Sequence, residues 1–461
     1  MSRDLRVAIV GAGPAGIYAG NILSSTGLDV AIDLFESLPA PYGLIRYGVA
    51  PDHPRIKGIV NSLHEMLDRG TVRFIGNVEF GRDLTLADLR RRYDAVIIAT
   101  GAIRDAELSI PGIELTGSYG AADFVSWYDG HPDVPRTWPL EAREIAVLGN
   151  GNVALDVARV LAKLPHDMLR TDIPENVAAG LAASPVTDVH VFGRRGPAQV
   201  KFTPIELREL GEVDGVETIV SAEDFEDAAA IDAAVAASGS NQVKVMVRTM
   251  RGWLDRPRTD ARRRIHLHFL HNPAAILGTD GAVTGIRFER TRLTDDGTVR
   301  GTGELREYAV QAVYRAVGYF GSPLPGLPFD DRLGVIRNLE GRVVDEAGQR
   351  IPGVYATGWI KRGPVGLIGH TKSDAMETIE HLVSDTEGLV RASERSDDAI
   401  FALLESRGVQ YTTWDGWLAL DAHERALGAA DTSDVERERI KVVDRDAQIA
   451  IATGVLSQSS P

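Results

Sequence analysis

Short apolar runs alternate with longer, helix-compatible segments along the first hundred residues. Residues 7–10, 30–35 and 94–99 are apolar runs of strand length, and residues 14–23 suit a helix. The third run ends in the tripeptide Ala-Thr-Gly at 99–101. Strands that alternate with helices predict a parallel sheet covered by helices.

The alternation starts again in the middle of the chain. A strand begins near residue 145, a helix covers about 152–163, and residues 188–192 form the next strand. Residues 164–187 between them contain several prolines and aspartates and are interpreted as an insertion. Apolar and polar residues alternate from 244 to about 315, which predicts antiparallel strands.

The last third returns to the first pattern. Residues 351–355 form a strand that ends in a second Ala-Thr-Gly, and the tail after about 384 is helical and rich in charge. We therefore predict an α/β protein in which one domain is split around an inserted one. The expected boundaries are 1–105 and 319–461 for the split domain, with its helical C-terminal tail, and 106–318 for the inserted domain.

A glycine-rich turn follows the first predicted strand. Gly11, Gly13 and Gly16 occupy the G-x-G-x-x-G frame of a dinucleotide-binding turn. In such a turn the first glycine allows a tight bend, the second lets backbone N–H groups approach a pyrophosphate, and the third lets the helix pack closely on the strand. Glu36 follows Gly16 by 20 residues, at a strand end where a carboxylate can bind ribose hydroxyls. The alternative is a tight turn with a solvated Glu36.

A second turn of the same kind follows the strand near residue 145. Gly149, Gly151 and Ala154 occupy the G-x-G-x-x-A frame, and Arg194 and Arg195 follow the next strand. Guanidinium groups bind a 2′-phosphate that a carboxylate would repel, so this site is predicted to take NADP(H) rather than NAD(H). The arginines come 40 residues after Ala154, a long gap that a looped-out insertion explains. The alternative is a solvated pair on a turn.

The composition narrows the class of protein. The chain has 461 residues, no cysteine and a formal net charge of −15. Without cysteine there is no redox-active cysteine pair and no cysteine-ligated zinc or iron–sulfur centre, and no metal-binding residue is predicted. The acidic balance argues against nucleic acid as the main partner. No apolar run is long enough for a membrane span, and we expect a cytoplasmic location.

Seven longer segments carry a resemblance to a known family. They are VAIVGAGPAG (7–16), LPAPYGLIRYGVAPDHPRIK (38–57), DAVIIATGA (94–102), GNGNVALDVAR (149–159), VFGRRGP (191–197), FTPIELREL (202–210) and GWIKRGPVGLIG (358–369). The chain resembles NADPH–ferredoxin reductases of the adrenodoxin reductase type, in particular the bacterial branch. The resemblance implies two Rossmann-like dinucleotide-binding domains, with the NADP domain inserted into a discontinuous FAD domain. It also implies hydride transfer from NADPH to FAD and single-electron transfer to an iron–sulfur ferredoxin.

The resemblance also implies which residues hold the cofactors. For FAD these are Gly11, Gly13, Ala15, Glu36, Leu44, Trp359, Gly366, Leu367 and Ile368. For NADP these are Asn150, Gly151, Asn152, Val153, Arg194, Arg195 and Glu206. Trp359 can stack on a cofactor ring, although core packing is the simpler role for a lone aromatic residue. A helix from about 371 to 382 would direct its positive end toward the flavin.

His53 and Glu209 match a paired histidine and glutamate near the reacting centre of the family. We assign both as catalytic residues that position the nicotinamide and tune the charge there, because hydride transfer to a flavin needs no enzyme nucleophile. Without the resemblance, His53 in the sequence PDHP would be read as a turn residue. Relatives carry an arginine where this chain has Ala106, and whether Arg104 replaces it is open.

A local excess of positive charge contrasts with the acidic whole. Residues 248–264 contain seven arginines and two aspartates. Such a patch would steer an acidic iron–sulfur ferredoxin toward the protein, although the solvated face of a hairpin would look the same. The docking candidates are Arg251, Arg256, Arg258 and Arg262. The basic pair at 361–362 is a second candidate surface.

Three other functions fit the sequence less well than that of a ferredoxin reductase. A diaphorase or quinone reductase needs only an accessible reduced flavin and stays open as an alternative. A related flavin reductase that passes electrons to a disulfide conflicts with the absence of cysteine. A non-catalytic dinucleotide sensor is disfavoured by the two glycine turns and the segment 358–369.

Overall fold

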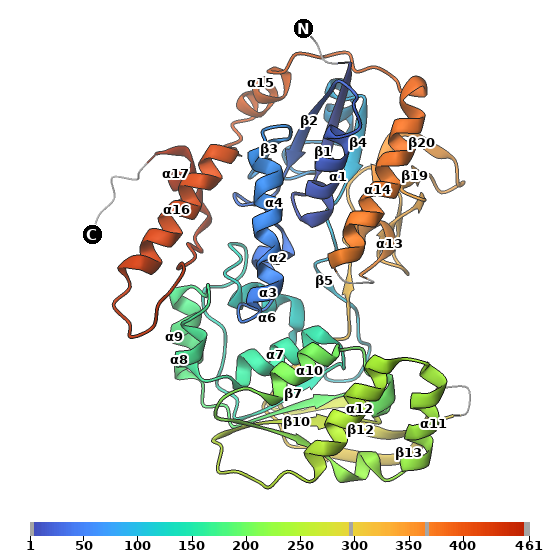
Figure 1. Ribbon diagram of the computed structural model, residues 1–461, viewed down its shortest axis with the longest axis vertical. Helices are drawn as coiled ribbons and strands as arrows, with labels where there is room; N and C mark the ends of the chain where they lie inside the picture. The colour runs from blue at the N-terminus through green and yellow to red at the C-terminus, as the bar shows by residue number, and fades with distance from the viewer. Residues whose placement is uncertain (1–3, 295–297, 365–367, 456–461) are drawn as a thin grey trace.

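The computed structural model describes residues 4–294, 298–364 and 368–455 (Figure 1). Two α/β domains lie one above the other along the long axis. In Figure 1 the first and last parts of the chain, blue and orange, share one domain, and the green and yellow middle part forms the other. This is the predicted arrangement of two Rossmann-like domains, one inserted into the other.

The first domain is built on an eight-stranded sheet. Its strands are β1 Leu5–Val10, β2 Val30–Phe35, β3 Arg73–Gly76, β4 Ala95–Ile98, β18 Asn338–Leu339, β19 Arg342–Val344, β20 Arg350–Ala356 and β21 Thr412–Thr413. Their order is β18-β19-β20-β4-β1-β2-β3-β21. The five central strands are parallel, and β20 pairs with β4 although residues 99–349 lie between them. Every residue of β1 is buried, as expected for a central parallel strand.

Helices from both parts of the chain cover this sheet. They are α1 Pro14–Ser24, α2 Leu44–Tyr47, α3 Pro54–Lys57, α4 Ile59–Asp68, α5 Leu86–Arg92, α13 Trp359–Arg362, α14 Ile368–Asp385, α15 Ala399–Ser406, α16 Trp414–Ala430 and α17 Arg445–Thr453. Helix α1 packs against both α14 and α4. The helix expected after the segment 358–369 is therefore present and lies beside the first one.

The second domain is built on a six-stranded parallel sheet. Its strands, in spatial order, are β6 Ser118–Gly120, β14 Ala312–Arg315, β7 Glu144–Leu148, β8 Asp188–Phe192, β10 Arg263–His268 and β9 Val216–Val220. Its helices are α6 Ala121–Tyr128, α7 Asn152–Ala162, α8 Pro165–Met168, α9 Glu175–Ala183, α10 Pro204–Gly211, α11 Ala228–Ser238 and α12 Asn241–Leu254. Helices α8 and α9 lie within the predicted insertion.

A three-stranded antiparallel sheet packs on the second domain. It consists of β11 His271–Thr279, β12 Ala282–Leu293 and β13 Val299–Tyr308. Phe192 of β8 meets Phe288 of β12 in one apolar cluster, with ring centroids 4.1 Å apart. The two sheets of this domain thus enclose a layer of aromatic and aliphatic side chains.

The prediction of antiparallel strands from 244 to 315 is correct only in part. Strands β11, β12 and β13 are antiparallel. Strand β10 pairs in parallel with β8, strand β14 pairs in parallel with β6, and α12 occupies the beginning of the stretch. Helix α12 buries Met246, Val247, Met250 and Trp253, which recur with a helical period. Ser240 caps the helix by accepting a hydrogen bond from the Val243 N–H.

The chain crosses between the two domains twice, and the two crossing segments lie side by side. The outgoing strand β5, Arg104–Asp105, pairs in antiparallel fashion with the returning strand β15, Tyr319–Phe320. A separate short pair, β16 Phe329–Asp330 and β17 Val335–Ile336, follows the return. The two connections between the domains therefore form one two-stranded ribbon.

The C-terminal tail contacts both domains. Glu424 in α16 forms an ion pair with Arg46 of the first domain, and Arg437 forms one with Glu175 of the second. Lys441 is buried, with its Nζ 3.0 Å from Asp172. No helix among the described residues is both long and apolar enough to cross a membrane.

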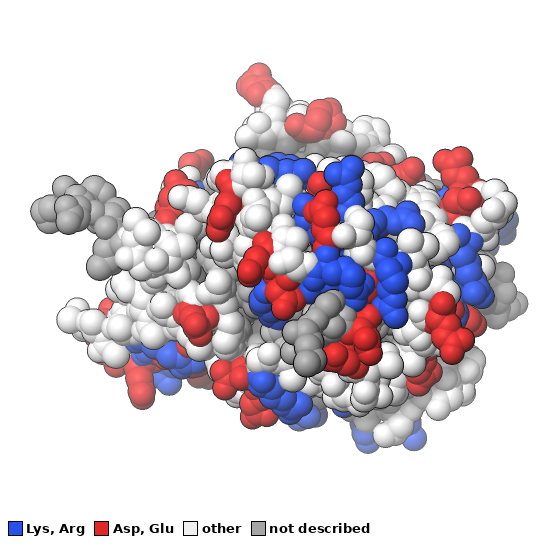
Figure 2. All heavy atoms as spheres, turned by 90° about the horizontal axis from the view of Figure 1, so that it is seen from above, with Lys and Arg blue, Asp and Glu red and all other residues white. Residues whose placement is uncertain are grey.

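The end of the molecule formed by the first domain carries charges of both signs. Figure 2 shows basic and acidic side chains interleaved on this face. Arg391 and Arg395 both pair with Asp94, and Arg92 pairs with Glu394. This end therefore presents a mixed surface rather than a patch of one sign.

Candidate functional site

The first glycine turn connects β1 to α1 and has the expected geometry. Gly11 has a φ of 108°, and a Cβ atom there would lie 2.5 Å from the Ala99 carbonyl oxygen. A Cβ atom at Gly16 would lie 1.9 Å from the Gly11 oxygen, so the helix approaches the strand too closely for a side chain. At Gly13 the nearest atom would be 3.9 Å away. The backbone at Gly13 thus has room beside it, as a pyrophosphate requires.

The segment before α2 lies against this turn. The Tyr42 N–H donates a hydrogen bond to the Ala12 carbonyl, and Gly43, with a φ of 50°, follows directly. Tyr42 itself has a φ of 83°, an uncommon conformation for a bulky residue, and its ring meets Trp417 edge-on at 5.5 Å. Leu44, which begins α2, is therefore held next to the glycine turn.

Glu36 lies buried at the end of β2. One carboxylate oxygen accepts a hydrogen bond from the Ala12 N–H at 2.8 Å, and the other accepts from the Leu38 N–H and the Ser37 hydroxyl. Burial raises the pKa of the Glu36 carboxyl, while these hydrogen bonds favour its ionised form. The carboxylate is thus fixed in orientation beside the glycine turn rather than solvated.

The segment that begins at Gly358 also lies against the first turn. A Cβ atom at Gly358, which has a φ of 76°, would be 2.6 Å from the Ala15 Cβ. Trp359 is half-buried at the start of α13, next to Gly358. Gly366 and Leu367 lie outside the described residues, and Ile368 begins α14, although its side chain is not described.

The second glycine turn connects β7 to α7. Gly149 has a φ of 142°, and a Cβ atom there would lie 2.2 Å from the Ala316 oxygen. At Gly151 no atom lies within 4 Å of the Cβ position, so space is open beside the backbone. Asn152 begins α7 and accepts a hydrogen bond from the Thr203 N–H at 3.1 Å, and Val153 is the next residue of the helix.

The two arginines predicted to bind a 2′-phosphate follow β8. A Cβ atom at Gly193 would lie 3.1 Å from the Asn150 side chain, so the end of β8 is next to the second turn. Arg194 is exposed and Arg195 is half-buried. The Nε atom of Arg195 is buried and has no hydrogen-bond partner, and neither arginine forms an ion pair with any described residue. A buried donor without a partner suits an anionic ligand.

The predicted pair His53 and Glu209 comes together at the junction between the domains. His53 precedes α3 in the first domain, and its Nδ1 lies 3.0 Å from the Glu209 carboxylate of α10 in the second. Its Nε2 lies 2.9 Å from Glu206 and 2.8 Å from Asp156 of α7. Glu206, expected at the NADP site, therefore contacts His53 directly.

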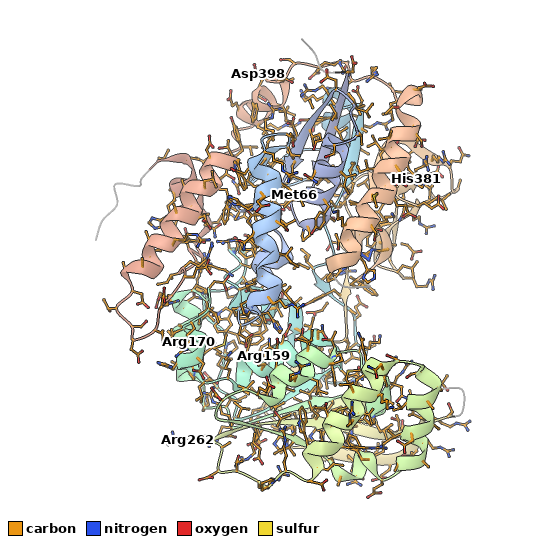
Figure 3. The ribbon with its side chains drawn as sticks, viewed as in Figure 1. Met66, Arg159, Arg170, Arg262, His381 and Asp398 are labelled. Atoms are coloured by element: carbon orange, nitrogen blue, oxygen red, sulfur yellow. The ribbon has the colours of Figure 1, made fainter. Side chains whose placement is uncertain are left out.

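Arg159 of α7 completes this cluster. Its guanidinium group donates two hydrogen bonds to Asp52, at 2.8 and 2.9 Å, and one to Asp156. Figure 3 shows Arg159 where the two domains meet. The segment 52–53 is thus attached to α7 and α10 by charged hydrogen bonds.

The charged groups of this cluster shift one another's pKa values. Burial alone would lower the pKa of His53, but its hydrogen bonds to Asp156 and Glu206 outweigh burial and raise the pKa to about 10. Although burial acts the other way, Arg159 and Lys163 hold the pKa of Asp52 below its ordinary value. His53 is therefore an imidazolium at neutral pH, surrounded by carboxylates. Burial raises the pKa of Glu209.

Sequence reasoning missed Asp52, Asp156 and Arg159. Asp156 and Arg159 are three residues apart on one helix, inside the segment 149–159 that carries the family resemblance. That spacing places both on one face of a helix that begins at a dinucleotide turn. This was the available signal, but the contact with residues 52–53 is not readable from one sequence.

The four docking candidates lie on the second domain. Arg251 of α12 pairs with Asp232 at 2.7 Å. Arg256, Arg258 and Arg262 are exposed on the loop before β10, where Arg258 lies 3.8 Å from Glu217. A helix and a loop carry these residues, rather than the hairpin that the sequence suggested. Figure 3 shows Arg262 at the outer edge of this domain, away from α13 and the start of α14 in Figure 1.

Three smaller predictions can be compared with the structure. Lys361 is only 5% exposed and pairs with Asp374 at 3.2 Å, so the pair at 361–362 is not a free basic surface. Arg104 is exposed on β5, in the ribbon that joins the domains. The long gap before Arg194 is occupied by α8 and α9, as the predicted insertion requires.

Comparisons with known proteins agree with this geometry. Residues 5–194 match the family described as pyridine nucleotide-disulphide oxidoreductase. The chain is 39% identical to NADPH-ferredoxin reductase FprA of Mycobacterium tuberculosis, over 98% of this chain and 100% of that one. It is 38% identical to the mitochondrial NADPH:adrenodoxin oxidoreductase of Homo sapiens, over 95% of this chain and 90% of that one. The solved structure of Mycobacterium tuberculosis FprA in complex with NADPH superimposes with a TM-score of 0.89 at 38% identity, covering 98% of this chain and 100% of that chain.

Proposed function

This chain belongs to the family of NADPH–ferredoxin and adrenodoxin reductases, and from that membership we propose that it is an FAD-dependent NADPH:ferredoxin oxidoreductase. The observation that carries the proposal is the pair of glycine turns, of which one adjoins a fixed carboxylate and the other two arginines without ion-pair partners among the described residues. When bound, FAD supplies the conversion of one hydride, received from NADPH, into two single electrons for an iron–sulfur ferredoxin.

The first turn suits FAD. The open space beside Gly13, the fixed orientation of Glu36 and the contact of Gly358 with Ala15 support FAD binding at this turn. In this proposal Gly11, Gly13 and Ala15 line the pyrophosphate, and Glu36 accepts hydrogen bonds from the ribose. The same proposal places Leu44, Trp359, Gly366, Leu367 and Ile368 against the rest of the FAD molecule.

The second turn suits NADP(H). Asn150, Gly151, Asn152 and Val153 form the turn and the first residues of α7, whose backbone N–H groups point at the pyrophosphate in this proposal. Arg194 and Arg195 bind the 2′-phosphate, which gives the buried Nε of Arg195 the partner it lacks.

His53 and Glu209 hold the nicotinamide end in place. The imidazolium of His53 is fixed by three carboxylates from α7 and α10, and it lies between the two domains that carry the two dinucleotides. Because both ring nitrogens are engaged, this cluster holds the two domains at a fixed relative position, and in this proposal it thereby positions the nicotinamide against the flavin. In this proposal both residues position the coenzyme and neither exchanges a proton in the hydride step.

In this proposal the inserted domain begins after residue 105 and ends at residue 318. The ribbon of β5 and β15 supports them, because both connections cross between the sheets at that point. Limited proteolysis at this ribbon would release a folded inserted domain if the boundaries are right.

The electron acceptor in this proposal is an acidic iron–sulfur ferredoxin. Arg256, Arg258 and Arg262 give an exposed positive surface, and Arg251 lies beside them with its charge partly neutralised by Asp232. Because the patch lies at the outer edge of the second domain, its role is electrostatic steering of the approaching partner. We therefore expect the KM for ferredoxin to rise with ionic strength, and to rise less steeply when Arg256, Arg258 and Arg262 are changed to glutamine.

One experiment tests the function. The purified protein should show the absorption of oxidised flavin, and NADPH should bleach it. Adding a [2Fe–2S] ferredoxin should then accelerate NADPH-dependent cytochrome c reduction many-fold. If ferredoxin gives no acceleration although the flavin is reduced, the acceptor is a small molecule, as in a diaphorase. A cytoplasmic location stays a proposal, to be checked by cell fractionation.

A further inference from the structure

Three histidines lie on one face of the second sheet, outside the site described above. His190 on β8 and His266 on β10 are directly opposite each other in the parallel register. Their rings stack with centroids 4.4 Å apart and planes 15° apart. His268 lies two residues further along β10 and so points to the same face, with its Nε2 3.0 Å from the Nδ1 of His190.

Carboxylates engage the far nitrogen of two of these rings. The Nε2 of His190 lies 3.0 Å from Glu144, and the Nε2 of His266 lies 2.8 Å from Asp188. A carboxylate on one ring nitrogen fixes the tautomer and leaves the other nitrogen as a lone-pair donor, which is the usual second shell of a histidine that binds a metal. The face is thus arranged as two carboxylate–histidine pairs and a third imidazole.

The spacing of the nitrogen atoms suits one small cation. One ring nitrogen from each of the three histidines lies within 4.8 Å of those of the other two. Tetrahedral zinc with Zn–N bonds of about 2.0–2.1 Å requires nitrogen atoms roughly 3.4 Å apart. The rings of His190 and His266 are nearly parallel, so rotation about χ2 of these half-buried side chains must turn their in-plane lone pairs toward one ion.

Aromatic side chains border the three rings on the inner side. Phe192 stacks on His268 at 4.6 Å and Tyr308 lies at 5.2 Å, which limits water on the inner side. Arg264, on the same strand, lies 3.5 Å from the same Asp188 oxygen that contacts His266.

We propose that His190, His266 and His268 bind one zinc-class divalent transition metal ion, with Glu144 and Asp188 as outer partners and water at the fourth position. The ion would link β8 to β10 through side chains. Strand β8 continues directly into Gly193, whose N–H donates to the carbonyl of His268, the last residue of β10, at 2.8 Å. Bound metal would therefore stiffen the second domain next to the loop that carries Arg194 and Arg195.

A second group of possible ligands is a poorer candidate. His53, Glu206 and Glu209 also have ligand atoms within 4.8 Å of one another. There, however, both nitrogens of His53 already contact carboxylates, and Arg159 lies 3.7 Å from Glu206. A cation at that place would meet an imidazolium and a guanidinium group.

The test uses the flavin-loaded protein after treatment with a chelator and dialysis. Titration with Zn²⁺ by calorimetry should show one site per chain, and Zn²⁺ should raise the melting temperature. Co²⁺ should give the visible absorption of a four-coordinate nitrogen site. His266→Phe and His268→Phe, which keep an aromatic ring in the stack, should each weaken Zn²⁺ binding at least tenfold and abolish the rise in melting temperature.

Two controls make the result specific. Tyr308→Phe removes a hydroxyl beside the stack and no ligand, so it should bind Zn²⁺ like the parent protein. His53→Gln removes a possible ligand from the second group and none from the three histidines, so it shows which of the two groups binds Zn²⁺. The proposal is wrong if the parent protein gives no Co²⁺ absorption, if the phenylalanine variants bind Zn²⁺ as tightly as the parent, or if only His53→Gln removes binding. The Co²⁺ spectrum of the parent decides the matter even if a phenylalanine variant does not fold.

Discussion

His53 and Asp156 belong to different domains, yet the Nε2 atom of His53 lies 2.8 Å from the Asp156 carboxylate. The contact joins the segment before α3 to the helix that begins at the second glycine turn. The relative position of the two dinucleotide sites therefore depends on a charged hydrogen bond between side chains, in addition to the ribbon of β5 and β15.

Replacing His53 by glutamine should lower stability in a pH-dependent way. The folded-state pKa of about 10 lies above the ordinary value of 6.5, so the stabilisation is complete below pH 6.5 and is lost as pH rises through 10. We expect His53→Gln to cost about 1–3 kcal/mol at pH 6.5 and much less above pH 10. Urea unfolding of both proteins at several pH values measures this difference. The double variant His53→Gln/Asp156→Asn should be little less stable than His53→Gln alone. If His53→Gln lowers the free energy of unfolding by the same amount at every pH, the assignment is wrong.

Changing both Arg194 and Arg195 to alanine should reverse the coenzyme preference. Loss of charged hydrogen bonds to a 2′-phosphate should cost about 1–3 kcal/mol for NADPH and almost nothing for NADH. Steady-state kinetics with both coenzymes measures the ratio of kcat/KM values. Arg170→Ala, which changes an exposed arginine of the same domain, is the matched control. An equal loss with both coenzymes would remove the 2′-phosphate site.

Glu36→Ala should release the flavin. The substitution removes the ribose partner and leaves the N–H groups of Ala12 and Leu38 without their acceptor. We expect FAD affinity to fall by about 1–3 kcal/mol, which is roughly 5- to 150-fold. Glu36→Gln keeps one acceptor and should lose less. The flavin-to-protein ratio after gel filtration gives the answer, and unchanged retention in both variants would exclude Glu36 from the site.

Lys441→Met should destabilise the whole molecule. The ammonium group of Lys441 contacts Asp172 and the Arg46 carbonyl, and its removal leaves Asp129 and Asp172 buried with Lys57 as their remaining cation. Breaking a buried ion pair from one side costs about 3–5 kcal/mol. Calorimetry should show a melting temperature lower by several degrees. Lys372→Met, on the exposed side of α14, should have no such effect, and equal shifts for both would refute the role of the tail.

Strands between clear turn signals could be predicted from the sequence with their bounds. The runs 30–35 and 188–192 are β2 and β8 as observed. β2 is apolar except for Asp33 and ends before Glu36, and β8 alternates polar and apolar residues and ends before Gly193. Helix α12 was missed because its basic residues, among them Arg248 and Arg251, interrupt the apolar spacing and imitate alternation. Its tertiary packing on β9 decides the helical state.

The site was predictable where residues lie next to a turn, and less so where distant segments meet. His53 and Glu209 could be paired through the family resemblance, and their 3.0 Å contact supports the pairing. Asp156 and Arg159 remained hidden because a contact between domains leaves no trace in local spacing. The three histidines on β8 and β10 looked like ordinary alternating strand positions, and only the parallel register of the two strands brings them together.

The pairing of β20 with β4 sets the order in which the chain can fold. Val354 lies opposite Val96 in the register, so the middle of the first sheet stays open during synthesis until the strand that ends at Ala356 has left the ribosome. The six strands of the second sheet all come from residues 118–315, so that domain can close earlier and independently. We expect the inserted domain to fold first and to act as a long, structured loop whose ribbon brings the two halves of the other domain together.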